Sequence, residues 1–404
     1  MKNLLVRISL LVFFLCILTV IIAFARGYRL DFQKKSFTST GILAVSSSPK
    51  AAKVFVNDEL KGVTDINLTL PPGRYHIEIK KDGYTSWKKD IVLKGELVTS
   101  ADASLFPLNP SLSPLTNLGI VKAVPLDQTE KIILFSENDN EEKDGIYLFE
   151  TAKKPLSLLP PLKPIILKKY FVNKDTLDFS KANVYFSPDY KQAIFEFPLP
   201  DETGESKPLA YLLSLEEENK VPFDVTFSKE TLLEAWETEK NDDRRKIIEA
   251  FPREIAKVAT DSFKILSFSP DETKILYSAN TSLTLPLAIK PPQIATNQTV
   301  EVRDLKKDRV YVYDKKEDRN YEVTIQQNTT SSSLLWYPDS KHFVFIDGKN
   351  ISTIDYDGLN KRIVYSGPFE NSLFTTTGDG NIIVLTNLNP ENNKLPDLYL
   401  IGIR

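Results

Sequence analysis

The sequence contains very little cysteine and very little histidine. Among its 404 residues there are one cysteine, Cys16, and two histidines, His76 and His342. A single thiol excludes a disulfide within the chain and a cluster of thiolate metal ligands. The two histidines lie far apart in the sequence, so neither is expected to complete a serine or cysteine triad. No residue is therefore identified as catalytic.

The common motifs of enzymes and cofactor sites are also missing. The chain has no G-x-x-x-x-G-K-[ST] or G-x-G-x-x-G loop, no H-E-x-x-H motif and no G-x-S-x-G turn. Acidic stretches at 138–145 and 355–358 lack the ligand spacing of a calcium loop, so we interpret them as solvated turns. We predict no cofactor, no metal ligand and no enzymatic activity.

Neither sign of charge is in excess. The chain carries 51 lysine and arginine residues against 54 aspartate and glutamate residues, a net charge of -3. A nucleic-acid-binding protein usually needs a basic face, so we expect no nucleic-acid partner. The length and the 42% hydrophobic content are enough for two or three buried cores.

One long apolar run stands near the amino terminus. Residues 8–25 contain no charge and would extend about 27 Å as a helix, roughly the thickness of a bilayer core. We predict a transmembrane signal-anchor at 8–25, a short cytoplasmic tail at 1–7 and a juxtamembrane linker at 26–40. The triplet Ala23-Phe24-Ala25 also fits a cleavage site, but the run is longer than the core of a typical signal peptide.

The charges that flank this run bear on its orientation. Lys2 and Arg7 precede it, and four basic residues follow it, namely Arg26, Arg29, Lys34 and Lys35. A simple count would place the carboxy-terminal part in the cytoplasm, but long downstream domains are translocated largely regardless of charge. We predict a single-pass protein of the cell membrane with the bulk of the chain outside the cytoplasm.

Residues 41–106 show short alternating runs separated by turn residues, which predicts a small antiparallel β-sandwich. The same segment resembles a PEGA domain, and the residues that carry the resemblance include Pro49, Ala52, Gly62, Thr64, Gly73, Gly83 and Tyr84. The resemblance implies a compact extracytoplasmic sandwich that acts as a spacer or a contact module. Prolines 107, 110 and 114 follow, so residues 107–118 are predicted to form a stiff linker.

A repeated turn dominates the remaining residues, 119–404. Three stretches begin FSPD at Phe186, FSPD at Phe268 and WYPD at Trp336, and each leads into an alternating apolar run. The turn residues are Pro188, Asp189, Pro270, Asp271, Pro338 and Asp339. Weaker copies surround Asp127 and Asp379, and the shortest interval between copies is about forty residues, the size of a four-stranded propeller blade. We predict a β-propeller of five blades, with six or seven as alternatives.

These stretches resemble the TolB-like propeller repeat, a relative of the WD repeat in which a Ser-Pro-Asp-Gly turn precedes a lysine. The fourth-position glycine is missing from the three clear copies. We interpret the repeated turns as part of the fold and not as an active site. Residues 229–259 interrupt the repeats with an apolar stripe of helical period, for which Ser228 is the expected cap. This helical insertion is predicted either to contact a partner or to cover an edge of the propeller.

These features together predict a mainly β protein made of an N-terminal transmembrane helix, a small sandwich and a propeller with a helical insertion. The predicted function is a membrane-anchored extracytoplasmic binding or scaffolding protein, in which a PEGA stalk presents the propeller to a protein or an envelope glycan. One alternative is a propeller-based hydrolase or lyase that acts on an envelope polymer. Another is the sensory part of a signalling complex.

Overall fold

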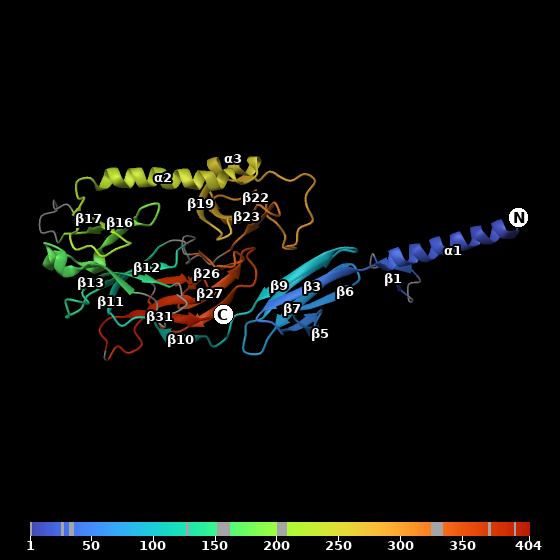
Figure 1. Ribbon diagram of the computed structural model, residues 1–404, viewed down its shortest axis with the longest axis horizontal. Coiled ribbons are helices and arrows are strands. Elements are labelled where there is room, and N and C mark those ends of the chain that lie inside the picture. The colour runs from blue at the N-terminus through green and yellow to red at the C-terminus, as the bar shows by residue number, and fades with distance from the viewer. Residues whose placement is uncertain are drawn as a thin grey trace. The chain divides into compact units, whose positions relative to one another are not determined.

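The computed structural model describes residues 2–25, 28–31, 36–126, 129–151, 162–199, 208–324, 334–370, 373–391 and 393–404 (Figure 1). The chain divides into two compact units. The first comprises Met1–Leu108 with Gln293–Val300, and the second comprises Asn109–Pro292 with Glu301–Arg404.

The amino-terminal helix α1 spans Lys2–Ala25 and precedes a small ladder of β1 (Tyr28–Asp31) and β2 (Ser36–Ser39). In its described part, the large apolar side chains are exposed over between 40% and 65% of their surface. No helix in the described ranges is both long enough and apolar enough to cross a bilayer. The predicted transmembrane segment at 8–25 is therefore not supported by the described residues.

Seven strands of the first unit form a sandwich of two sheets, ordered β6-β3-β9 and β5-β4-β7-β8. Their bounds are β3 (Gly41–Ser48), β4 (Lys53–Val56), β5 (Glu59–Val63), β6 (Ile66–Leu70), β7 (Gly73–Lys80), β8 (Trp87–Leu93) and β9 (Val98–Ser104). In β3 every second residue is buried, because successive side chains of a strand point to opposite faces. Leu43 and Val45 of β3 meet Val54 and Ile79 of the other sheet in one core.

The sandwich is mixed, so the prediction of an antiparallel sandwich is wrong in one ladder. Strands β3 and β9 pair in parallel, with Ile42 opposite Val98 and Ser48 opposite Ser104. A parallel pair needs a long crossover, and the four strands of the facing sheet together with β6 lie between β3 and β9 in the sequence.

Most of the predicted linker at 107–118 is built into the two units. The N–H of Leu108 donates to the carbonyl of Gly83 at 2.9 Å, and Pro107 forms a bridge with Tyr84. Residues 111–114 form strand β10 (Ser111–Pro114), which belongs to the second unit. Pro107 and Pro114 take part in extended pairing here, so most of the range predicted to be a stiff linker belongs to one unit or the other.

The described part of the second unit contains five four-stranded sheets, and they form the blades of a β-propeller. The first two blades are β11 (Ile120–Pro125), β12 (Lys131–Ser136), β13 (Gly145–Glu150), β14 (Leu162–Leu167), and β15 (Asn183–Phe186), β16 (Gln192–Phe197), β17 (Leu209–Ser214), β18 (Phe223–Asp224). Blade 3 consists of β19 (Phe263–Phe268), β20 (Lys274–Ala279), β23 (Val310–Asp314) and β24 (Arg319–Glu322). Blade 4 consists of β25 (Leu335–Trp336), β26 (His342–Asp347), β27 (Asn350–Asp355) and β28 (Arg362–Ser366).

Blade 5 is assembled from the two ends of the propeller sequence. It contains β29 (Phe374–Thr376), β30 (Ile382–Thr386) and β31 (Asp397–Gly402), and its fourth strand is β10. Leu112 of β10 lies opposite Ile401 of β31 in an antiparallel ladder. The first strand of the propeller sequence, β10, thus joins the last blade and covers the edge of β31, which would otherwise be open.

Connecting segments carry the remaining short elements. Three 3-10 helices follow blade 1, namely η1 (Lys168–Tyr170), η2 (Lys174–Thr176) and η3 (Phe179–Lys181). A two-stranded ladder of β21 (Leu283–Thr284) and β22 (Asp304–Leu305) lies in the segment between β20 and β23.

The central strands of the blades are buried on both faces. In β12, Ile133 and Phe135 pack in the core between blades 1 and 2, whereas Ile132 and Leu134 pack in the core between blades 1 and 5. This two-sided burial explains why the run is continuously apolar and not strictly alternating. A third core, which includes Leu276 and Phe343, joins blades 3 and 4.

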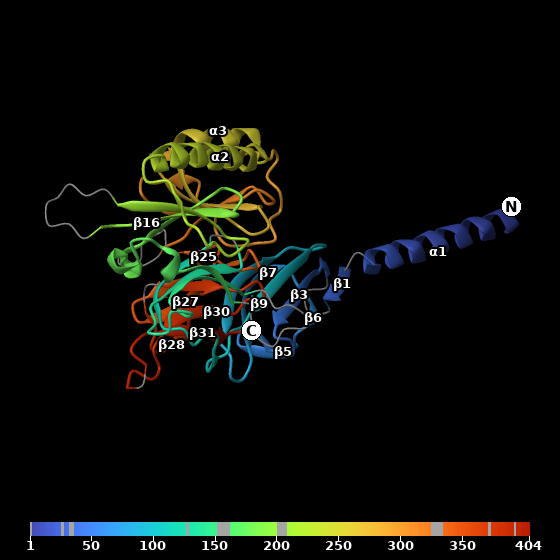
Figure 2. The same cartoon turned by 60° about the vertical axis from the view of Figure 1, so that its left-hand side comes forward.

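Two helices occupy the space between blades 2 and 3. They are α2 (Lys229–Glu249) and α3 (Arg253–Ser262), and both lie along the same side of the propeller (Figures 1 and 2). The face of blade 2 that points away from blade 1 packs against α2 through Ile194, Ala210, Val225, Leu232, Leu233 and Trp236. The face of blade 3 that points away from blade 4 packs against the end of α2 and against α3 through Ile275, Tyr277, Tyr313, Ile247, Phe251 and Ile255.

The ends of α2 and α3 agree only in part with the capping predicted from the sequence. Pro252 precedes α3, as expected for a residue that interrupts one helix and opens the next. Ser228 is the N-cap residue of α2, but its side chain accepts no hydrogen bond from the first turn, so the predicted capping bond is not formed.

We expect α2 and α3 to stabilise the propeller, because they pack against the faces of blades 2 and 3. Ile255 is fully buried in α3, so Ile255→Ala should lower the free energy of unfolding by about 2–5 kcal/mol through lost burial and a residual cavity. Lys257 in the same helix is exposed, and Lys257→Ala should change it by less than about 0.5 kcal/mol. Urea denaturation followed by tryptophan fluorescence measures both. Equal stabilities would mean that the helices are a dispensable appendage.

Candidate functional site

The Pro-Asp turns connect the first and second strands of their blades. In blades 2 and 3, a serine side chain forms hydrogen bonds within the turn. In blade 3, the N–H of Glu272 donates to the carbonyl of Ser269 at 2.8 Å, which closes a β-turn around Pro270 and Asp271. Ser269 Oγ donates to Asp271 Oδ1 at 2.7 Å and accepts from the N–H of Lys274 at 3.0 Å. Proline sets φ at the second position of such a turn, and aspartate binds the backbone two residues later.

The same geometry recurs in other blades. In blade 2, Ser187 Oγ donates to Asp189 Oδ1 at 2.7 Å, and the N–H of Lys191 donates to the same carboxylate at 3.1 Å. In blade 5, Thr377 takes the place of the serine, because its Oγ1 donates to Asp379 and accepts from the N–H of Asn381 at 2.9 Å. The repeated residues are thus used for hairpin closure in at least these three blades.

The fourth position of each turn adopts a left-handed backbone. The φ angles are 55° at Tyr190, 53° at Glu272, 59° at Ser340 and 86° at Gly380. Glycine accepts this conformation without strain, which accounts for the glycine of the related repeats. Blade 5 keeps it as Gly380, whereas the three clearer copies carry a side chain there.

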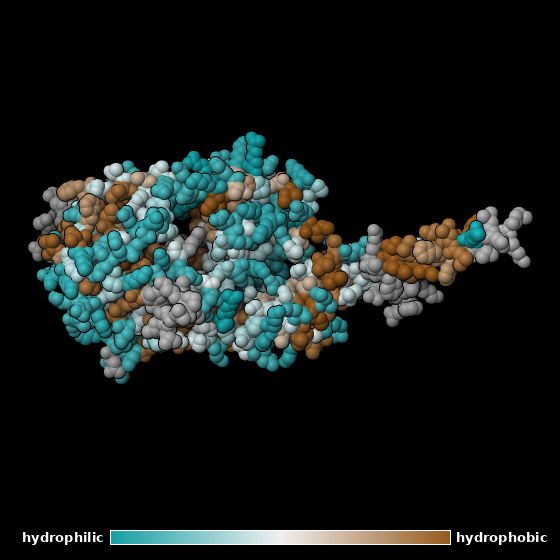
Figure 3. Space-filling model, viewed as in Figure 1, coloured by the Kyte–Doolittle hydropathy of each residue, from teal (hydrophilic) through white to brown (hydrophobic). Residues whose placement is uncertain are grey.

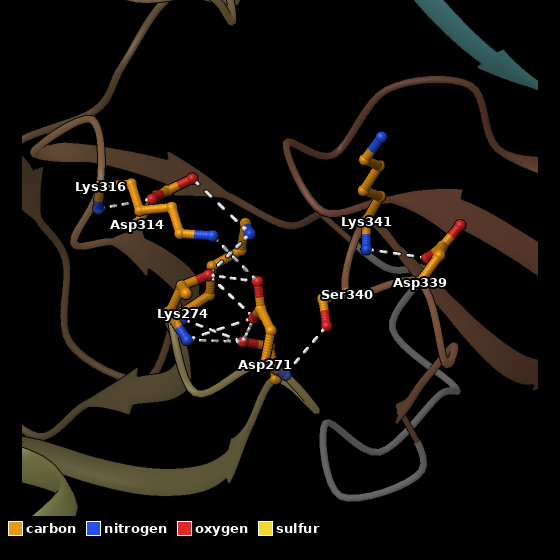
Figure 4. Close-up of polar contacts among 9 residues, drawn as sticks. Asp271, Lys274, Asp314, Lys316, Asp339, Ser340 and Lys341 are labelled. Atoms are coloured by element: carbon orange, nitrogen blue, oxygen red, sulfur yellow. Dashed lines mark hydrogen bonds and ion pairs between the residues drawn. The ribbon is translucent and has the colours of Figure 1, made fainter. Parts of the chain in front are cut away.

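Neighbouring turns also bond to one another. The N–H of Asp271 in blade 3 donates to Ser340 Oγ in blade 4 at 3.1 Å, as Figure 4 shows. The phenol of Tyr337 in blade 4 donates to the carbonyl of Gly380 in blade 5 at 2.6 Å. Polar contacts between turns therefore link blades 3, 4 and 5.

A buried lysine and aspartate lie beside the turn of blade 3. Lys274 and Asp314 face each other across β20 and β23, and their charged groups are 3.8 Å apart. Lys274 is 6% exposed, its Nζ donates to Thr273 Oγ1 at 3.1 Å, and it lies 5.0 Å from the ring centre of Tyr356 in blade 4. The ammonium group is thus held by a carboxylate, a hydroxyl and an aromatic face. Figure 4 shows Lys274 and Asp314 beside the turn of blade 3.

Blade 4 has a histidine where blade 3 has Lys274. His342 lies opposite Asp355 across β26 and β27, with Nε2 3.4 Å from Asp355 Oδ1, and its Nδ1 is 2.7 Å from Asp339 Oδ2. Burial disfavours the charged ring, but the two carboxylates outweigh it and raise the pKa of His342 above its usual value. Burial raises the pKa of Asp355. The pair holds the hairpin together from within.

Asp271 has an unusually acidic side chain. Burial by itself would raise its pKa, but hydrogen bonds from Ser269 and Thr273 and the nearby charge of Lys274 hold the pKa of Asp271 well below its usual range. Lys316 Nζ lies 3.4 Å from Asp271 Oδ2 on the exposed side.

The PEGA-motif residues are likewise engaged in the sandwich. Thr64 Oγ1 accepts from the N–H of Ala52 at 3.0 Å and lies 2.6 Å from Ser47 Oγ, in a buried position. Pro49 lies in the same loop, where its carbonyl accepts from Ser47 Oγ at 2.7 Å. These bonds tie the turn after β3 to the end of β5.

Two of the motif glycines have positive φ, 152° at Gly62 and 81° at Gly83. A Cβ at Gly62 would also approach Ile66 Cδ1 to 2.6 Å, so this position needs glycine for space as well. At Gly73 a Cβ would meet only ordinary contacts. Tyr84 packs against the sandwich core.

The described residues offer no metal centre, since no group of three or more histidine, cysteine, aspartate or glutamate side chains converges among them. Asp127, the turn residue predicted for blade 1, lies outside the described residues. Sequence reasoning missed the pairs Lys274–Asp314 and His342–Asp355. The available signal was the aspartate that ends the third strand in both DRVYVYD and ISTIDYD.

Removing the side chain at the left-handed position should stabilise blade 3. Glu272 is exposed with φ of 53°, so Glu272→Gly should raise the free energy of unfolding by about 0.5–1 kcal/mol, because relief of strain exceeds the added chain entropy. Lys257→Gly, inside α3, should lower it by about 1 kcal/mol. Thermal unfolding of both variants checks the signs, and a loss of stability in Glu272→Gly would contradict the strain argument.

The acidity of Asp271 predicts a pH dependence of stability. Because its pKa is lower in the folded chain than in the unfolded chain, the carboxylate stabilises the fold above about pH 4, and this contribution is lost as the pH falls further. Wild type should therefore melt above Asp271→Asn at pH 6, and the difference should shrink towards pH 3. Glu217→Gln, at an exposed position, serves as the control. A constant difference across this range would refute the assignment.

Comparison with known protein families identifies the sandwich of the first unit. Residues 40–109 match the PEGA domain family. Solved structures that match this chain include a TolB protein from Agrobacterium tumefaciens, at 12% identity and a TM-score of 0.22, covering 69% of this chain and 70% of that one. Another is the β-propeller domain of the Trilobed protease from Pyrococcus furiosus, at 9% identity and a TM-score of 0.20, covering 93% and 88%.

A third is the oligogalacturonate lyase of Vibrio parahaemolyticus, at 9% identity and a TM-score of 0.25, covering 88% of this chain and 97% of that one. Similarity at these levels does not bear on function. No curated protein matches the chain. The predicted resemblances are confirmed: the chain contains a PEGA domain at residues 40–109, and its second unit is a β-propeller.

Proposed function

We propose that this protein is a membrane-anchored binding or scaffolding protein, in which the PEGA sandwich is a stalk and the propeller contacts a protein or an envelope glycan. The bulk of the chain would lie outside the cytoplasm. A PEGA domain and a propeller fit a binding or scaffolding role. Anchoring and the choice of partner are the parts that need testing.

The observation that carries the anchoring is the surface of α1. Its described apolar side chains include Leu10, Leu11, Val12 and Phe13, which follow one another around the helix axis and are all at least 52% exposed. A helix that is apolar all round is expected to be buried in a membrane or in other protein. Insertion of α1 into a bilayer would remove this surface from water.

The second support is the use of the repeated polar residues. Ser269, Asp271 and Lys274 bond within the fold, as do Ser187 and Asp189. The repeats thus serve hairpin closure and blade contacts. Recognition would then fall on surfaces that differ from blade to blade.

Charges within α1 should release the protein from membranes. In Leu15→Arg/Leu18→Arg the two arginines would face the bilayer core at a cost of several kcal/mol, so the variant should leave the membrane fraction after an alkaline carbonate wash. Leu60→Arg, at a position that is 55% exposed on the sandwich, should remain in the pellet with wild type. Immunoblotting of the two fractions gives the result. Wild type in the wash would refute anchoring by α1.

The same strains report orientation. A carboxy-terminal tag on wild type should be digested by external protease in cells whose outer barriers are permeable and whose cell membrane is intact. Digestion only after the cell membrane is opened would place the propeller in the cytoplasm and overturn the extracytoplasmic part of the proposal.

A further inference from the structure

An apolar surface with acidic neighbours lies where blade 2 leads into α2. Val221, Phe223 and Phe227 are 83%, 66% and 91% exposed, although side chains of this kind are usually buried. Exposed carboxylates in the same stretch are Glu216, Glu217, Glu218, Asp224, Glu230 and Glu234. We call residues 216–234 with these side chains the acidic apolar patch.

The patch adjoins the hydrophobic core between blade 2 and α2. Phe223 lies opposite Leu212 across β17 and β18, and Leu212 packs against the cluster that joins blade 2 to α2. Val225, two residues after Phe223 and therefore on the same side of the chain, is buried in that cluster. Figure 3 shows hydrophobic residues at the surface at the upper left, over β17 and the start of α2. The interface between blade 2 and α2 thus reaches solvent at this point.

The charge of the patch is one-sided. Only Lys220 and Lys229 oppose its six carboxylates, and Lys229 is already engaged by Glu196 at 2.5 Å and Glu230 at 3.0 Å. The neighbouring first half of α2 adds Glu237 and Glu239. A segment that exposes both apolar and acidic side chains is complementary to a ligand that carries apolar and basic side chains together.

We propose that the acidic apolar patch binds a short basic, amphipathic segment of a partner protein. The inference rests on the proposed binding function and deepens it, because it names the surface and the chemistry of the partner. Apolar side chains of the partner segment contact Val221, Phe223 and Phe227, and its lysines or arginines pair with exposed carboxylates of residues 216–234.

Other occupants are less well matched. Two copies related by a twofold axis would oppose the same acidic residues, and like charges repel across such an interface. An anionic membrane surface would be repelled for the same reason. Addition of a strand to β18 is hindered by Pro222, which has no N–H to donate, so recognition rests on side chains.

The test uses the full chain in nanodiscs of neutral lipid and a fluorescent ten-residue peptide of alternating lysine and valine with one central phenylalanine. Fluorescence anisotropy should show binding that weakens with added salt, with empty nanodiscs as the blank. Val221→Ser/Phe223→Ser should weaken it about tenfold or more. Glu216→Gln/Glu217→Gln/Glu218→Gln should weaken it several-fold and reduce its dependence on salt.

Leu388→Ser is the matched control, because Leu388 is a 43% exposed apolar residue elsewhere on the propeller. This variant should bind the peptide as wild type does. Because the altered side chains are exposed, all variants should keep the melting temperature of wild type. Equal binding by all variants, or equal binding of a peptide with glutamate in place of lysine, would overturn the proposal. So would binding of the patch to anionic vesicles, or self-association that Phe223→Ser abolishes.

The outcome is separable from that of the proposed function. Failure of the peptide to bind while the protein stays in the membrane fraction removes this patch and leaves the anchored scaffold. Peptide binding by a protein that is released by carbonate keeps the patch and removes the anchor.

Discussion

The propeller depends on burial of its central strands on both faces. In β12, adjacent residues such as Ile132 and Ile133 belong to different cores, so blade 1 needs a neighbour on each side. No blade can bury its apolar residues alone, and every gap in the ring has to be filled. This requirement explains the pairing of β10 with β31 at one joint and the helices α2 and α3 at another.

The polar residues of the repeats meet a second requirement, that of orienting each hairpin. A serine or threonine hydroxyl, an aspartate and a left-handed fourth residue recur at Ser187, Ser269 and Thr377. Bonds such as Asp271 to Ser340 then hold adjacent turns together. The pairs Lys274–Asp314 and His342–Asp355 occupy matching positions in neighbouring blades. Two different basic residue types, lysine and histidine, thus lie opposite a buried aspartate at the same position of the blade.

This division of labour bears on function. Residues that repeat from blade to blade are committed to the fold, so under the proposed binding function specificity would come from elements that occur once. The segment 216–234 is such an element, since it joins blade 2 to the helix pair and combines exposed apolar and acidic side chains. A scaffold built in this way can vary its contact surface without altering its blades.

The sequence by itself determined the local features. Proline and aspartate specified the turns, alternating and continuous apolar runs specified strands, and a stripe of period 3.6 specified the helices, because each depends on residues close together in the chain. Tertiary structure alone decided that Ser111–Pro114 completes blade 5, that β9 pairs with β3 in parallel, and that α2 and α3 separate two blades. The cross-strand partners of Lys274 and His342 were also settled there. These outcomes depend on which distant edges and faces remain uncovered, and a local pattern does not encode that.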